Sequence, residues 1–94
     1  MDYEVFKEVG SERFVAADGD EELGFLSYRE DETSVTIEHT VVQPQHRGRG
    51  VAAALAEHAL RRLAAANDKR IVPQCSYVRD YIARHPEHAP LTRR

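Results

Sequence analysis

The hydrophobic pattern of this chain changes its period once, on either side of Pro44, and this change limits the possible folds more than any other feature. Residues 33–42 are dense in β-branched side chains, which favour a strand. Because alternate residues of a strand share a face, one face is expected to hold Val35, Ile37, His39 and Val41. Pro44 ends the strand because proline has no amide hydrogen to donate to a neighbouring strand. The sequence therefore predicts a strand followed by a different element.

That next element is an amphipathic helix over residues 48–66. Its apolar positions recur every four residues: Val51, Leu55, Ala59 and Leu63, widened by Ala54, His58 and Ala66. Glu57, Arg61 and Arg62 fall on the opposite side and are expected to face water.

Shorter segments complete the predicted fold. Residues 3–8 and 13–17 predict a hairpin, and residues 23–28 a third strand, because turn-forming residues separate the three. After the helix, residues 69–73 predict a strand parallel to residues 33–42, connected to it by a right-handed crossover. The pattern predicts an α+β (mixed α/β) fold, with N-terminal antiparallel strands leading into a parallel strand–helix–strand unit.

The C-terminal residues predict one more helix. Ser76 is suited to cap a helix over residues 77–84, because its hydroxyl can accept a hydrogen bond from the first turn. From about residue 87 we expect a tail.

Length and composition exclude several classes of protein. The 94 residues suit one domain over residues 1–94. A single cysteine and the lack of a leader-like start favour the cytoplasm. The longest apolar run, residues 51–56, is far below the roughly 20 residues that cross a bilayer, so we expect a soluble protein with no membrane partner. The five histidines and one cysteine have no metal-site spacing, so no metal is expected.

The charge balance weighs against a nucleic-acid partner. The net charge is -3 and aromatic residues make up 7%, whereas a binder of RNA or DNA needs a positive surface and rings for base stacking. A local basic patch remains the alternative, formed by Arg47, Arg49, Arg61 and Arg62.

The segment between the strand at residues 33–42 and the long helix has the composition of an anion-binding loop. Gly48 and Gly50 let the backbone approach a ligand closely, and the first turn of the helix presents unpaired amides with a partial positive charge. Arg47 and Arg49 add two guanidinium groups. A phosphate or pyrophosphate suits this segment; the alternative is a glycine-containing turn with solvated arginines.

The pattern Gln-x-x-Gly-x-Gly over residues 45–50, opening a helix after a β-branched strand, resembles the pyrophosphate loop of the GNAT superfamily of N-acetyltransferases. Together with the small residues at the start of the helix and the segments 38–42 and 72–87, it is similar to one subgroup. This subgroup is the minimal GNAT-like family, whose members have the size of one small domain. The resemblance covers residues 23–87.

The resemblance implies a reduced GNAT-like fold, acetyl-CoA as cofactor and an amine as acceptor. It implies that the amides of residues 47–50 hold the pyrophosphate and that residues 40–42 run beside the pantetheine arm, where an amide near Val41 could polarise the thioester carbonyl. The expected cofactor-binding residues are Thr40, Val41, Val42, Gln45, Arg47, Gly48, Arg49, Gly50, Val51 and Ala52. The short turn at residues 9–12 leaves no room for the helices that usually build the acceptor site, so the acceptor stays unidentified.

Two side chains are candidates for catalysis. Cys75 stands where the second parallel strand ends and the last helix begins, and it could be a nucleophile, an acid or base, or a small buried side chain. His39 could be a general base or a core-facing imidazole bound to a backbone carbonyl. Contact between the two is feasible because they come from neighbouring parallel strands.

The favoured hypothesis is therefore an N-acetyltransferase that moves acetyl from acetyl-CoA to an amine on a small molecule or a protein. The alternative is a CoA-binding or acyl-CoA-sensing module without efficient turnover. The sequence leaves the acceptor, the acyl chain and the oligomeric state open.

Overall fold

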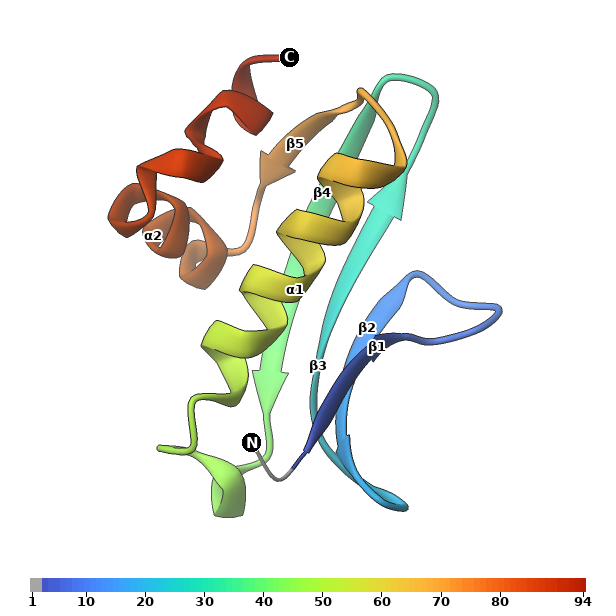
Figure 1. Cartoon of the computed structure of the whole chain (residues 1–94), viewed down its shortest axis with the longest axis vertical. Helices are drawn as coiled ribbons and strands as arrows, with labels where there is room; N and C mark the ends of the chain where they lie inside the picture. Colours follow the sequence, from blue (N-terminus) through green and yellow to red (C-terminus); the bar gives the residue numbers. More distant parts are fainter. Residues whose placement is uncertain (1–2) are drawn as a thin grey trace.

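The computed structural model describes residues 3–94, which form one five-stranded sheet with helices packed against it (Figure 1). The strands lie in the order in which they occur in the chain: β1 (Glu4–Lys7), β2 (Arg13–Asp18), β3 (Glu21–Glu30), β4 (Ser34–Val42) and β5 (Arg70–Pro73). The first four pair antiparallel, and β5 pairs parallel with β4. This arrangement confirms the predicted α+β class, with β3 longer than the expected 23–28.

Four helical segments follow or interrupt the strands: the 3₁₀ turn η1 (Pro44–His46), α1 (Val51–Ala66), α2 (Ser76–Arg84) and the 3₁₀ segment η2 (Pro86–Arg93). α1 begins at Val51 rather than at residue 48, because Gly50 has a φ of 77° and cannot be part of the right-handed helix. The prediction that Ser76 caps α2 is wrong: Cys75 occupies the cap position and makes no side-chain capping hydrogen bond. None of the helices in the described part of the chain is long and apolar enough to span a bilayer.

α1 crosses one face of the sheet and supplies much of the core (Figure 1). Its buried residues are Val51, Leu55, Ala56, Ala59, Leu60 and Leu63. They pack against apolar side chains from β2, β3, β4 and β5, among them Phe14, Leu26, Ile37 and Ile71. The four residues of the predicted stripe are buried. Ala56 and Leu60 widen it, in place of Ala54 and His58, which are half-buried, and Ala66, which is exposed.

The sequence predicted a tail from about residue 87, and this prediction is wrong. The residues after α2 form η2, in which His88 and Leu91 are buried. η2 lies against β5 and α2, so it covers apolar surface that the two elements would otherwise expose.

β4 contains an irregularity that decides which side chains face α1. Ser27 of β3 pairs with His39, but its neighbour Tyr28 pairs with Ile37, so Glu38 is an extra residue on β4. Val35 and Ile37 are fully buried, whereas His39 is exposed and Val41 is 45% exposed. The prediction that these four side chains share one face is therefore wrong, because the bulge reverses the alternation after Ile37.

β4 also separates from β5 at this point. The parallel pairing runs from Ser34 with Arg70 to Ile37 with Pro73 and then ends. Beyond it, one further backbone hydrogen bond connects the two segments: the amide of Cys75 donates to the carbonyl oxygen of Ile37 over 3.0 Å. The rest of β4 is paired with β3 alone, so its edge toward β5 has no partner strand after Ile37.

Candidate functional site

A cavity of about 560 Å³ lies where the end of β4, the start of α1 and the start of α2 meet. Eight of its lining residues were predicted to bind a cofactor: Thr40, Val41, Val42, Arg47, Gly48, Gly50, Val51 and Ala52. Three others were not predicted: His46, Ala53 and Tyr77. Tyr77 belongs to the first turn of α2, which the sequence alone does not place opposite the glycine loop.

The loop before α1 needs its two glycines for its conformation. Gly48 and Gly50 have φ values of 85° and 77°, in the left-handed region that other residues rarely adopt. A Cβ atom built on either glycine would meet no atom within 4 Å, so the backbone there borders open space. Together with the cavity lining, this leaves the backbone accessible to a ligand.

The N-terminal end of α1 is available to an anion. Gly50 provides no side-chain cap, and the first turn contains no acidic residue. The first amides of a helix have no partner within the helix, and they carry the positive end of the helix dipole. Since Val51, Ala52 and Ala53 of this turn line the cavity, the arrangement suits a negatively charged group such as a phosphate.

Two residues predicted to bind the cofactor lie elsewhere. The Gln45 side chain is exposed and donates to the Gln43 side-chain oxygen over 2.7 Å. The Arg49 guanidinium lies 3.0 Å from His46 Nδ1 and 5.7 Å from the centre of the Tyr3 ring. Neither side chain lines the cavity, whereas Arg47 does.

Cys75 follows β5, at the point where the pairing between β4 and β5 ends. Its side chain is half-buried, and its thiol donates to Thr40 Oγ1 over a distance of 3.6 Å. Cys75 also precedes the first residue of α2, where the helix dipole favours a negative charge. The structure thus brings the predicted thiol next to a residue of the cavity wall.

The structure does not place His39 next to the Cys75 thiol. Neighbouring side chains of a strand point to opposite faces, so His39 points away from the side on which Thr40 meets Cys75. The hypothesis of a core-facing imidazole is wrong, because His39 is exposed on the strand after the bulge.

A second polar cluster, centred on Glu57, lies outside the cavity. Glu57 Oε1 accepts hydrogen bonds from the Tyr81 hydroxyl over 2.6 Å and from His88 Nε2 over 2.8 Å, and its other oxygen meets Arg61. The bond from Tyr81 above all, helped by Arg61 and His88 and opposed by burial, lowers the pKa of Glu57 from 4.5 to about 2. Burial, and then the bond to Glu57, raises the pKa of Tyr81. Glu57, predicted to face water, instead connects α1 to α2 and η2.

The part of the chain covered by the structure contains no group of three or more His, Cys, Asp or Glu side chains able to hold a metal ion. The candidate site consists of the loop backbone, Thr40 and Arg47 in the cavity wall, and Cys75, which contacts Thr40.

Comparison with known proteins identifies the family. The family model described as GCN5-related N-acetyl-transferase matches residues 13–91. No curated protein sequence matches the chain. Among solved structures, a Bacteroides thetaiotaomicron protein described as an acetyltransferase of the GNAT family is similar, with a TM-score of 0.44 and 20% identity. The match covers 81% of this chain and 44% of that protein, so this chain spans less than half of its length. Because the family model extends over most of the sequence, the chain belongs to the GCN5-related N-acetyltransferase family.

Proposed function

We propose that the protein binds acetyl-CoA in the cavity between β4, α1 and α2 and transfers the acetyl group to an amine. The observation that carries this proposal is the glycine loop: two glycines with positive φ and an uncapped helix start line one cavity with the end of β4. Membership of the family supports the same reaction class.

The residues present fit the chemical groups of acetyl-CoA. The amides of the loop and of the first turn of α1 would bind the pyrophosphate, with Arg47 at the cavity wall adding positive charge. Residues 40–42 would lie beside the pantetheine arm, because their edge toward β5 is unpaired after Ile37. Bound there, acetyl-CoA would supply an activated acetyl group.

The transfer breaks the carbon–sulfur bond of the thioester and forms a carbon–nitrogen bond to the acceptor. The amine loses a proton, and the leaving thiolate of CoA gains one. Cys75 has two possible roles: its thiol could donate the proton to the leaving thiolate, or its thiolate could first accept the acetyl group and pass it to the amine. Its contact with Thr40 of the cavity wall and its place where the pairing between β4 and β5 ends support either role.

His39 has a narrower possible role. Because it is exposed on the opposite side of β4 from Thr40, it could deprotonate only an amine that reaches β4 from that face. We therefore propose Cys75 as the first residue to test and His39 as the second.

Titration of the isotope-labelled protein with desulfo-CoA tests binding. We expect amide chemical-shift changes concentrated in residues 40–42 and 47–53. Changes confined to other elements, or none at saturating ligand, would remove the basis of the proposal.

Incubation with acetyl-CoA and a panel of amines tests the transfer. We expect consumption of acetyl-CoA that depends on the amine, and a strong loss of rate in Cys75→Ala. A mass increase of one acetyl group on wild-type protein without an amine, absent in Cys75→Ser, would identify Cys75 as the nucleophile. Binding without any consumption of acetyl-CoA would instead favour the CoA-binding module.

A further inference from the structure

We propose that the Thr40 hydroxyl carries a proton from the Cys75 thiol to a thiolate that leaves in the cavity, so that Cys75 acts as an acid through Thr40 and not as a nucleophile. This inference rests on the proposed function for its consequence, the loss of acetyl transfer. Its structural part, the hydrogen bond between the two side chains, can be measured without any ligand.

Thr40 belongs to the cavity wall, and Cys75 contacts that wall through it. Thr40 lines the cavity together with the glycine loop and the first turn of α1, and its Oγ1 atom lies 3.6 Å from the Cys75 sulfur. Cys75 does not line the cavity itself, and its half-buried side chain packs against the hydrophobic core. The structure therefore connects the thiol to the cavity by way of the Thr40 hydroxyl.

Backbone hydrogen bonds hold both residues in place. The Cys75 amide donates to the carbonyl oxygen of Ile37 on β4 over 3.0 Å, and the Cys75 carbonyl oxygen accepts from the amide of Arg79 on α2 over 3.0 Å. Thr40 is paired with Leu26 of β3. The separation of the thiol from the hydroxyl is thus set by paired elements of the fold.

A threonine hydroxyl can accept one hydrogen bond and donate another at the same time. While Oγ1 of Thr40 accepts from the Cys75 thiol, the hydrogen of the hydroxyl points away from that sulfur and can be donated to a group in the cavity. Accepting from the thiol also makes the hydroxyl a better donor, because hydrogen bonds in a chain polarise one another.

The proton transfer balances with these two residues, water and the acceptor amine. As the carbon–sulfur bond of the thioester breaks, Thr40 gives its hydroxyl hydrogen to the leaving thiolate and takes the thiol hydrogen of Cys75. Cys75 is then a thiolate at the start of α2, where the helix dipole favours a negative charge. The proton that the amine releases to water returns to Cys75, so both residues end unchanged.

The same contacts weigh against Cys75 as the nucleophile. A sulfur that attacks the thioester carbon has to approach it directly, in a near-attack geometry. The Cys75 sulfur is half-buried, and the part of the cavity wall that it meets is the Thr40 side chain. A proton can pass through a hydroxyl in this position, whereas an acetyl group cannot.

The infrared S–H stretch tests the hydrogen bond without ligand. The chain has one cysteine, so the protein gives one S–H band. A thiol that donates a hydrogen bond absorbs at a lower frequency than a free thiol. We expect the band to move to higher frequency in Thr40→Val, which removes the hydroxyl but keeps the β-branched shape, and to stay near its wild-type position in Thr40→Ser.

Acetyl transfer tests the proton path. In Thr40→Val we expect turnover to fall by about 100-fold, a usual contribution of a proton donor, while desulfo-CoA affinity stays within about threefold of wild type. Thr40→Ser keeps the hydroxyl and should keep turnover within about tenfold of wild type. Cys75→Ala should lose about as much as Thr40→Val, and the double variant no more than either alone, because the two side chains act as a unit.

Thr36→Val is the matched control for Thr40→Val. Thr36 is also a half-buried threonine of β4, but it pairs with Val72 of β5 and does not line the cavity. This variant should leave the S–H band, desulfo-CoA affinity and turnover unchanged. If Thr40→Val does not fold, Thr40→Ala removes the same hydroxyl.

A wild-type S–H band in Thr40→Val would overturn the inference, as would equal losses of turnover in Thr40→Ser and Thr40→Val. An acetyl group found on Cys75 after incubation with acetyl-CoA would overturn it as well. Failure of the wild-type protein to consume acetyl-CoA with any amine would instead contradict the proposed function, and the S–H band of the unliganded protein would still decide whether the Cys75 thiol is bonded to Thr40.

Discussion

Gly50 determines where α1 starts, and its backbone conformation presents the amides of the loop to the cavity. Its φ of 77° costs a residue with a Cβ atom about 1–2 kcal/mol. We expect Gly50→Ala to lower the free energy of unfolding by about that amount and to weaken the binding of desulfo-CoA, because the relaxed loop no longer presents its amides. Calorimetric titration and thermal unfolding measure the two effects.

Gly19 provides the matched control for this prediction. It has a φ of 60° and open space around its Cβ position, but it lies in the turn between β2 and β3 and does not line the cavity. Gly19→Ala should therefore lose similar stability and keep its affinity. Equal losses of affinity in both variants would show that strain anywhere in the fold weakens binding, and would contradict a specific role of Gly50.

Tyr81 and Glu57 lead to a prediction about acid stability. The pKa of Glu57 is about 2 in the folded protein against 4.5 ordinarily, so its carboxylate stabilises the fold above pH 4.5, and this stabilisation is lost as the pH falls toward 2. Tyr81→Phe removes the largest cause of the shift. We expect it to lower the free energy of unfolding at pH 7 by about 1–3 kcal/mol and to flatten its decline between pH 5 and 2.

Denaturant unfolding at several pH values measures this effect, with Tyr77→Phe as the control. Tyr77 is 39% exposed, and the hydroxyl that bonds Glu57 is that of Tyr81, not that of Tyr77. A pH profile of Tyr81→Phe with the same slope as wild type would contradict the assigned cause of the Glu57 shift.

At the scale of the elements, the sequence was sufficient for the order and type of the five strands and of α1 and α2, but not for η1 and η2 or for the phase of β4. The residues on the two sides of the bulge are of similar type, so the alternation of Val35 and Ile37 continues without interruption to His39 and Val41. One extra residue, Glu38, reverses that alternation and carries no local signal of its own. Contact between Cys75 and His39 was therefore considered feasible, whereas the observed partner of the thiol is Thr40.

The loop was predictable because its glycines and its place before a helix are local properties. The places of His46 and Tyr77 in the cavity wall depend on tertiary packing instead: the His46 ring contacts Glu21 of β3, and Tyr77 reaches the cavity from α2. Neither contact has a signature in the neighbouring sequence.

Gly24 of β3 shows how closely the site depends on packing between two strands. A Cβ atom at this position would lie 2.5 Å from the Val41 carbonyl oxygen and 3.2 Å from the Val42 Cα, both backbone atoms of the cavity wall. We expect Gly24→Ala to push β4 away, to lower the free energy of unfolding by about 1–3 kcal/mol and to weaken desulfo-CoA binding. Gly10→Ala, strained by a φ of 82° in an exposed turn, should lose stability without losing affinity. Unchanged amide shifts at residues 40–42 in Gly24→Ala would contradict this reasoning.

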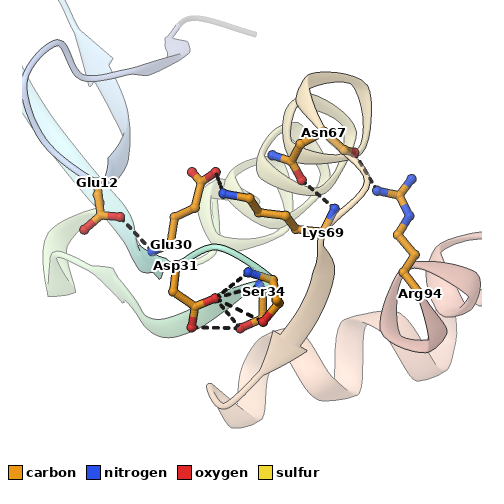
Figure 2. A network of polar contacts seen from close by, with 8 residues as sticks. Glu12, Glu30, Asp31, Ser34, Asn67, Lys69 and Arg94 are labelled. Atoms are coloured by element: carbon orange, nitrogen blue, oxygen red, sulfur yellow. Dashed lines mark hydrogen bonds and ion pairs between the residues drawn. The ribbon is translucent and has the colours of Figure 1, made fainter.

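At the scale of the whole molecule, the end of the fold away from the cavity is connected by polar contacts at the surface. Figure 2 shows Lys69, before β5, bonded to Glu30 of β3 over 2.7 Å, and Arg94 bonded to the carbonyl oxygen of Asn67 over 2.7 Å. Glu12 also accepts a hydrogen bond from the backbone amide of Glu30. Contacts of this kind near solvent contribute little, typically about 0–1 kcal/mol for an ion pair. The packing of buried apolar side chains contributes more to the stability of the fold.

Leu91 of η2 illustrates that packing. It is 7% exposed and belongs to the main hydrophobic core, although the sequence placed it in a tail. We expect Leu91→Ala to lower the free energy of unfolding by about 2–4 kcal/mol, the usual cost of removing a buried leucine side chain. For Lys69→Met, which breaks the ion pair to Glu30, we expect a loss below about 1 kcal/mol. Denaturant unfolding of the two variants beside wild type measures both changes. A larger loss of unfolding free energy in Leu91→Ala than in Lys69→Met would make residues 86–93 an integral part of the fold. A larger loss in Lys69→Met would mean that the polar contacts hold the C-terminal segment in place and that η2 adds little to the core.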